Sequence, residues 1–186
     1  ARLVFCFENH PEREDGIISG AQDSIGICVP GLCRHYYDNH FWPERLETCE
    51  DEEILQWLER HLCMIPMEPR CPGCSVVEGQ DITPGKVRAL AASAERCWTA
   101  IMNMDLDAFA TAYKDSFHAQ VAMFPAMIQG SVPDYIEKYS VMEDVLAWKM
   151  PGAGGGGYLA VVVKNAGEFC NAHPEAIELR IRRSGM

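Results

Sequence analysis

Gly152-Ala153-Gly154-Gly155-Gly156-Gly157 is the stretch that decides the fold of this chain, because it leads directly into the apolar run Tyr158 to Val163. Five of its six residues are glycines, which lose more backbone freedom on folding than any other residue. Such a cluster is typical of a tight loop in which backbone N–H groups closely approach another backbone or an anion. We therefore predict a loop at 152–157, preceded by a helix and followed by a strand.

The strand after this loop is predicted to lie inside a sheet. Tyr158 to Val163 is continuously apolar, which is the pattern of a strand buried on both faces. Near the C-terminus, Ile177 to Arg182 alternates apolar with charged residues, as in a strand with one solvated face. Upstream, Leu32 to Asp38 and Leu62 to Met67 are two further strand candidates.

Three helices are predicted in the middle of the chain. Thr83 as N-cap, with Pro84 at the first helical position, begins the first. Asp105 caps the second, and a third is expected from about Val132 to Ala147. Residues 1–8 and 51–61 also have helical patterns, whereas 16–31 is predicted to be rich in loops. Helices grouped between strands favour an α+β domain with helices packed on one face of an antiparallel sheet.

The composition is that of a globular domain and excludes some partners. The chain has 186 residues, of which 48% are apolar and 23% are charged, and its net charge is −11. This charge argues against nonspecific binding to nucleic acid or to an anionic membrane surface. No apolar run approaches the about 20 residues that span a bilayer, so we expect a soluble protein.

The nine cysteines are irregularly spaced and odd in number, which is not the pattern of a disulfide framework. We therefore expect reduced thiols and a cytoplasmic protein. Cys71 and Cys74 form a Cys-x-x-Cys pair that fits a redox site or half of a zinc site, although no second pair accompanies it. A surface loop is the simpler interpretation of this pair.

Two common nucleotide-binding motifs match the glycine run only in spacing. The Gly-x-Gly-x-x-Gly fingerprint requires a strand before the glycines and a helix after them, and the predicted order here is the reverse. A Walker loop requires a lysine where Tyr158 stands. Neither motif therefore applies to this chain.

The glycine run and its flank Trp148-Lys149-Met150-Pro151 resemble the third motif of the GHMP small-molecule kinases, named for galactokinase, homoserine kinase, mevalonate kinase and phosphomevalonate kinase. The resemblance implies that Gly152, Ala153, Gly154, Gly155, Gly156 and Gly157 lie against the phosphate loop of an N-terminal lobe. There they would help to shape the site of γ-phosphoryl transfer. Pro151 departs from the Ser or Thr that is usual in the family.

The segment Gly20-Ala21-Gln22-Asp23 resembles the part of sugar-type members, such as galactose, fucose and heptose kinases, that carries the catalytic aspartate. The resemblance implies that Asp23 orients the attacking hydroxyl and accepts its proton. Gln22, Arg34 and Tyr36 are then candidate substrate-binding residues. Without the resemblance, Asp23 is a turn-forming residue beside Gly20, and a strand with alternating faces explains Arg34 and Tyr36 equally well.

The resemblance also implies a domain organisation. Residues 1–30 would be the tail of the N-terminal lobe with the loop of the catalytic aspartate, and residues 31–186 the C-terminal domain, an α+β domain with a ferredoxin-like antiparallel sheet. The expected cofactors are ATP and Mg²⁺, and the expected partners are a sugar-like substrate and the N-terminal lobe of the same protein. No Pro-x-x-x-Gly-Leu-Gly-Ser-Ser phosphate loop is present, so we expect a longer protein of which this part is inactive alone.

Three other interpretations remain open at this point. The chain could be a non-enzymatic ligand-binding or regulatory α+β module, in which the glycines only allow close packing. His118, with no metal-binding or catalytic partner at suitable spacing, is expected to be a surface or hydrogen-bonded residue. Lys149 matches a lysine that is common before the glycine loop of the family, or it is a surface residue.

Overall fold

The structure, a computed structural model, describes residues 1–10, 18–70 and 75–185. The chain forms two compact units, the first comprising Ala1–Leu55 with Ile181–Met186 and the second comprising Gln56–Arg180. This division differs from the expected boundary after residue 30. That boundary stays a prediction about the lobes of a longer protein.

The second unit contains a four-stranded antiparallel sheet. Its strands are β3 (Leu62–Pro66), β4 (Val145–Lys149), β5 (Tyr158–Val163) and β6 (Ile177–Glu178), and their order across the sheet is β4-β5-β3-β6. Helices separate β3 from β4, and α7 (Ala166–Ala172) separates β5 from β6. The resulting βαββαβ order is that of a ferredoxin-like fold, which confirms the expected α+β class.

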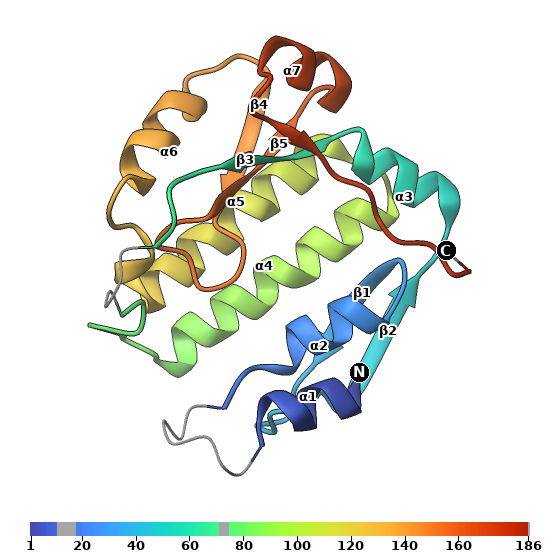
Figure 1. Ribbon diagram of the computed structural model, residues 1–186, viewed down its shortest axis with the longest axis vertical. Coiled ribbons are helices and arrows are strands. Elements are labelled where there is room, and N and C mark those ends of the chain that lie inside the picture. Colours follow the sequence, from blue (N-terminus) through green and yellow to red (C-terminus); the bar gives the residue numbers. More distant parts are fainter. Residues whose placement is uncertain (11–17, 71–74, 186) are drawn as a thin grey trace. The chain divides into compact units, whose positions relative to one another are not determined.

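The connection between β3 and β4 holds the long helices α4 (Pro84–Met102) and α5 (Leu106–Met123), which run side by side in Figure 1. The Thr83 side chain accepts a hydrogen bond from the amide of Lys86, and that of Asp105 accepts one from the amide of Ala108. Both predicted N-caps are therefore confirmed. A short helix η1 (Pro125–Met127) and α6 (Val132–Ser140) complete the connection. No helix in the described part of the chain combines the length and apolarity needed to cross a membrane.

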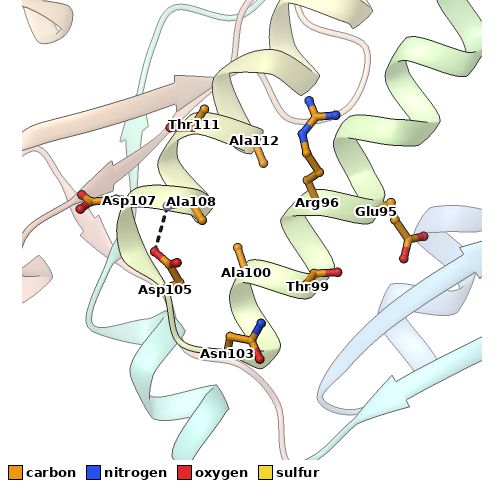
Figure 2. A pocket seen from close by; sticks show the side chains of 10 residues that line it. All are labelled: Glu95, Arg96, Thr99, Ala100, Asn103, Asp105, Asp107, Ala108, Thr111 and Ala112. Atoms are coloured by element: carbon orange, nitrogen blue, oxygen red, sulfur yellow. Dashed lines mark hydrogen bonds between the residues drawn. The ribbon is translucent and has the colours of Figure 1, made fainter.

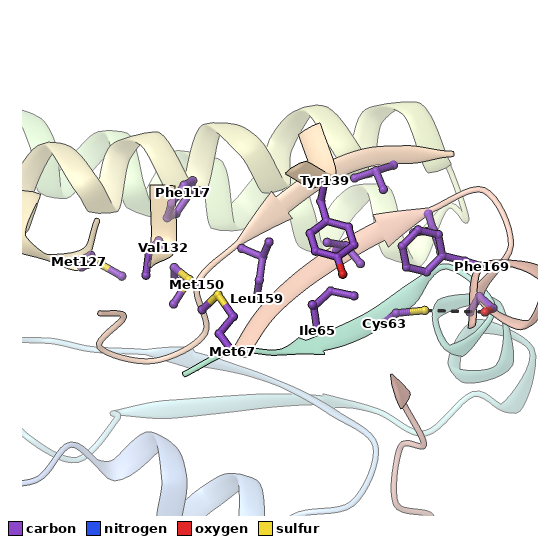
Figure 3. Packing of buried hydrophobic residues seen from close by; sticks show 14 residues of the cluster. Cys63, Ile65, Met67, Phe117, Met127, Val132, Tyr139, Met150, Leu159 and Phe169 are labelled. Atoms are coloured by element: carbon purple, nitrogen blue, oxygen red, sulfur yellow. Dashed lines mark hydrogen bonds between the residues drawn. The ribbon is translucent and has the colours of Figure 1, made fainter. Parts of the chain in front are cut away.

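The main core lies between one face of this sheet and its helices (Figure 3). Ile65 of β3 and Leu159 of β5 are partners in the sheet and are fully buried on this face. Phe117 of α5, Tyr139 of α6 and Phe169 of α7 belong to the same cluster. All of β5 after Tyr158 is buried, as the sequence predicted, and this strand has a neighbour on each side in the sheet.

The first unit contains two short helices and a two-stranded antiparallel sheet. Its elements are α1 (Arg2–Glu8), α2 (Ala21–Cys28), β1 (Leu32–Tyr36) and β2 (Arg45–Cys49). The Ser24 hydroxyl donates to the Glu8 carboxylate at 3.0 Å and so connects α1 with α2. Helix α3 (Glu52–Glu59) follows β2 and has residues in both units.

Two predicted elements are wrong. Residues 21–28, expected in a loop, form α2, because Ala21, Ser24 and Ile25 are spaced so that one helical face is buried. The helix expected to continue to Ala147 ends at Ser140, and residues 145–149 form β4 instead. The turn through Met142 reverses the chain between them, and the burial of Val145 and Ala147 alternates as in a strand.

Three further differences concern short segments. Strand β2 and helix α7 were not predicted, and the strand expected over 177–182 is limited to Ile177–Glu178. Helix α7 begins at the N-cap Asn165, whose side chain accepts from the amide of Glu168 at 3.1 Å. Elements of this length have too few residues to give a clear periodicity.

The N-cap of α5 can be tested by its contribution to stability. We expect Asp105→Ala to lower the free energy of unfolding by about 1 kcal/mol, because the amide of Ala108 loses its acceptor. Asp107→Ala removes the same charge from the same helical turn without removing a cap, so it is the matched control and should cost less. Urea denaturation measures both, and equal losses would contradict the role assigned to the cap.

Candidate functional site

The glycine run connects β4 to β5, two neighbouring antiparallel strands, and its backbone has an unusual conformation. The φ angles of Gly152, Gly154, Gly155, Gly156 and Gly157 are 63°, 75°, 77°, 145° and 92°. Residues other than glycine disfavour positive φ angles. The glycines are therefore required by the course of the loop, as the sequence predicted, although a strand and not a helix precedes it.

Backbone hydrogen bonds fix the second half of the loop. Gly157 donates to the carbonyl of Glu68 and accepts from the amide of Met67, both at 2.9 Å, which continues the pairing of β3 with β5. The amide of Gly155 donates to the carbonyl of Met127, also at 2.9 Å. The loop is thus attached to the segment after β3 and to η1.

Close contacts give a second reason for glycine at two positions. A Cβ atom on Gly156 would lie 2.7 Å from the carbonyl oxygen of Glu68 and 2.8 Å from the backbone nitrogen of Arg70. On Gly154, a Cβ atom would lie 2.9 Å from the Cβ of Met127. The Arg70 guanidinium also donates to the carbonyl of Gly154, at 3.1 Å from Nε and 2.8 Å from Nη2. This half of the loop is built for close packing.

The tip of the loop, Gly152 and Ala153, is exposed. The Gln120 side chain of α5 donates from Nε2 to the carbonyl of Gly152 at 3.1 Å. Within residues 1–10, 18–70 and 75–185, the amide groups of Gly152, Ala153, Gly154 and Gly156 have no hydrogen-bond acceptor. At the exposed residues Gly152 and Ala153, amides of this kind can donate to an anion.

Lys149, the last residue of β4, lies behind the tip. Its ammonium donates to the Ser116 hydroxyl at 2.9 Å and to Oε1 of Gln120 at 2.7 Å. Burial lowers the pKa of Lys149 to about 8, an effect that the nearby Cys97 thiol opposes. No carboxylate of the described chain pairs with it. Lys149 is therefore a largely buried cation linked by Gln120 to the glycine loop, and not a surface residue.

A small cavity of about 220 Å³ adjoins the tip. Its lining is mostly apolar and consists of Val76, Val77, Gln120, Phe124, Met127 and Ala153. Close to the loop, Nε2 of Gln129 is buried and has no hydrogen-bond partner among the described residues. The surroundings of the tip thus combine polar groups with apolar surface.

The other predicted site residues belong to the first unit. Asp23 and Gln22 are exposed and lie in the first turn of α2, where the positive end of the helix dipole favours a carboxylate. Their expected place in a loop is thus corrected to a helix N-terminus with Gly20 as N-cap. Asp23 and the glycine loop lie in different units, so their joint role stays a prediction.

Arg34 and Tyr36 lie on the same face of β1, and the structure brings them together with two residues that the sequence did not suggest. The guanidinium carbon of Arg34 lies 4.6 Å from the centre of the Tyr36 ring, and that of Arg45 lies 3.6 Å from it. The Tyr36 hydroxyl donates to the Glu47 carboxylate at 2.6 Å. Charged and apolar residues alternate in Arg45-Leu46-Glu47, as in a strand. This pattern is the sequence signal from which the cross-strand partners could have been predicted.

The remaining candidates give no site in the structure. Cys71 and Cys74 lie outside the described residues. His118 is exposed on α5, in agreement with the sequence interpretation. Among the residues that are described, no three His, Cys, Asp or Glu side chains are grouped so that they could hold a metal ion.

A larger groove of about 560 Å³ lies between α4 and α5 and contains none of the predicted site residues. Figure 2 shows the residues that line it, of which Arg96 and Thr99 belong to α4 and Thr111 and Ala112 belong to α5. Arg96 pairs with Asp115 at 2.8 Å, and Asp105 is used as the N-cap of α5. Because Arg96 and Asp105, two of its charged side chains, are already engaged, the groove is a weaker candidate than the glycine loop.

Comparison with known proteins gives a fold and no family. No protein-family model matches the sequence, and no curated protein is significantly similar to it. The structure is similar to that of a protein from Campylobacter jejuni described as a "putative sugar kinase", with a TM-score of 0.57 and 19% sequence identity. The similarity covers 92% of this chain and 52% of that one, so the chain spans about half the length of that protein. At this identity, the likeness shows the fold alone.

Because Gly156 is closely packed and Gly152 is not, we expect substitutions at the two positions to reduce the stability of the protein by different amounts. We expect Gly156→Ala to lower the free energy of unfolding by about 2 kcal/mol or more, because strain at φ 145° adds to a collision with the Glu68 carbonyl. Gly152→Ala meets open space and should cost about 1 kcal/mol for its φ of 63°. Urea denaturation of both variants checks this order, and an equal or reversed order would contradict it.

The burial of Lys149 predicts a pH-dependent stability. Its pKa is about 8 in the folded protein and near 10.5 when unfolded, so between these values the unfolded state binds more protons. Stability should therefore rise with pH across this window, and Lys149→Met should remove that rise and stabilise the protein at neutral pH by up to roughly 3 kcal/mol. Denaturation of both proteins at several pH values provides the measurement. Parallel pH profiles would show that Lys149 is solvated.

Proposed function

We propose that this chain is the C-terminal part of an ATP-dependent kinase of the GHMP type, which transfers the γ-phosphoryl group of ATP to a hydroxyl of a sugar-like substrate. The main support for this proposal is the glycine loop between β4 and β5. Its sequence resembles the third family motif, the residues at its tip are exposed and have amides without an acceptor in the described chain, and a partly buried cation lies behind it. The fold shared with the Campylobacter jejuni protein is consistent with it.

The loop has the donors that a phosphate group needs. Gly152 and Ala153 are exposed residues whose amides have no acceptor within the described chain, so these amides can donate to phosphate oxygens. Hydrogen bonds of Gly155 and Gly157 anchor the second half of the loop next to this tip. Nucleotide phosphates therefore fit the chemistry of the tip. Mg²⁺ is expected to reduce the negative charge of the triphosphate, and no residue of this chain is assigned to it.

Asp23 is the proposed general base. The oxygen of the substrate hydroxyl would attack the γ-phosphorus, the bond from this phosphorus to the β-γ bridging oxygen would break, and ADP would leave. The Asp23 carboxylate would accept the proton that the hydroxyl loses. Its exposure at the start of α2 allows a substrate to reach it. Gln22, Arg34 and Tyr36 would contact the substrate, and the N-terminal lobe of a longer protein would supply the phosphate loop.

A second candidate function is a non-enzymatic ligand-binding module. The observation that favours it is the packing of Gly154 and Gly156, whose close contacts with Met127 and Glu68 explain these glycines without any ligand. ADP release by the complete protein, measured with ATP, Mg²⁺ and a panel of sugars, distinguishes the two functions. A module would bind a sugar without releasing ADP.

The role of Asp23 is tested by Asp23→Asn in the complete protein. We expect the rate of ADP release in the presence of the sugar to fall by at least about 100-fold, because the carboxylate that accepts the proton is lost. ATP binding should stay within about twofold of the wild type, because Asp23 is not assigned to the nucleotide site.

The matched control is Asp134→Asn, which makes the same change at another exposed position in the first turn of a helix. Its turnover should equal that of the unmodified protein. Turnover by Asp23→Asn at the level of this control would exclude Asp23 as the base.

A further inference from the structure

Lys149 has an electrostatic environment that the fold alone does not require. Its ammonium is partly removed from water and, among the described residues, has only neutral partners, the Ser116 hydroxyl and the Gln120 amide. A buried cation without a carboxylate destabilises a protein, and a hydrophobic side chain at this position would avoid that cost. In a chain with 27 acidic residues, a lysine left without one points to a counter-charge that is not part of the described chain.

The position of Lys149 identifies where this counter-charge would bind. Gln120 accepts from the ammonium through Oε1 at 2.7 Å and donates through Nε2 to the carbonyl of Gly152 at 3.1 Å. A single side-chain amide thus separates the cation from the tip of the loop. The same tip exposes amides that have no acceptor within the described residues. A positive charge and amides without an acceptor are therefore connected through the Gln120 side chain.

We propose that the Lys149 ammonium is the counter-charge for a tetrahedral oxyanion that binds at the tip formed by Gly152 and Ala153. The oxyanion is a phosphate group, either of a nucleotide or of free inorganic phosphate. This inference rests on the proposed function, because it assigns the charge that attracts the phosphate to the glycine loop. Lys149 acts through the electric field and through Gln120, so it is a positioning residue and not a catalytic one.

Two titratable groups near Lys149, Cys97 and Tyr113, have raised pKa values, so they should not titrate together with Lys149. From α4, Cys97 has a pKa raised by burial to about 11, so this thiol stays protonated at moderately alkaline pH. From α5, burial also raises the pKa of Tyr113.

Other charged groups near Lys149 have partners of their own. Arg96 and Asp115 form an ion pair at 2.8 Å, and Lys114 lies over the Trp148 ring at 5.3 Å from its centre. A change in anion affinity as the pH rises through about 8 would therefore report on Lys149.

The experiment is a titration of the complete protein with sulfate, a tetrahedral anion whose charge is constant at neutral and alkaline pH. Labelling glycine with ¹³C at the carbonyl allows the Gly152 resonance to be followed by NMR without loss of signal through amide exchange. We expect Lys149→Met to weaken sulfate binding at about pH 7 by about tenfold, as expected for the loss of one partly screened charge near the anion.

The pH dependence provides a readout that a purely structural role would not change. In the unmodified protein, sulfate affinity should fall by about tenfold from about pH 7 to about pH 10, because the amine loses its proton. In Lys149→Met it should be constant over the same range. Bound sulfate should also raise the pKa of Lys149 by about one unit, since the two equilibria are linked.

Two control variants distinguish the effect of the Lys149 charge from that of another lysine and from that of a hydrogen bond to Lys149. Lys164→Met removes an exposed lysine that pairs with Glu143 and Asp144, and it should leave sulfate affinity within about twofold. Ser116→Ala removes one hydrogen bond of Lys149 but keeps its charge, so its pH dependence should persist. Displacement of sulfate by ATP would identify a nucleotide phosphate as the ligand, and displacement only by inorganic phosphate would identify the free anion.

Two outcomes would overturn the inference. Only the second would also exclude the phosphate-binding role of the loop in the proposed function. Sulfate binding at Gly152 that is equal in the unmodified protein and in Lys149→Met would remove Lys149 and leave the loop as an anion site. No sulfate binding at the tip at any pH would exclude both the inference and the phosphate-binding role of the loop.

Discussion

The pairing of Gly157 with residues 67 and 68 is the interaction on which the glycine loop depends. It extends the ladder between β3 and β5 beyond the ends of both strands, so the last residue of the loop is joined to the strand pair that leads into the buried part of β5. The contact is possible only because Gly156 brings no side chain against the carbonyl of Glu68. Packing of the sheet and placement of the loop tip are therefore consequences of the same backbone approach.

Local features of the fold could be predicted from the sequence, whereas features set by distant contacts could not. Thr83 and Asp105 are recognisable as caps because each bonds to an amide three residues away. Strand β5 is recognisable because six consecutive residues are apolar or aromatic. In contrast, 145–149 fits both a helix and a strand, and only pairing with β5 decides between them. Residues 21–28 contain glycine and serine, yet burial of one face makes them a helix.

The candidate site shows the same limit. The glycines predict a tight loop, because glycine is the residue type that readily adopts positive φ angles and five residues of the loop have them. The connection from Lys149 to Ser116 and Gln120 crosses 33 and 29 residues of sequence, and nothing local marks these partners. Asp23 is recognisable only through its resemblance to a family motif. A surface aspartate at the start of a helix is common for reasons of stability alone.

The attachment of the loop at Gly155, Gly157 and the Gly152 carbonyl has a consequence for how a ligand would meet it. The entropy needed to order so many glycines is lost when the domain folds, before any ligand arrives. A group that binds at Gly152 and Ala153 would therefore encounter a preorganised surface, with little induced fit and a small entropic penalty. In the proposed site the loop would thus be a preformed wall and not a lid that closes over the ligand.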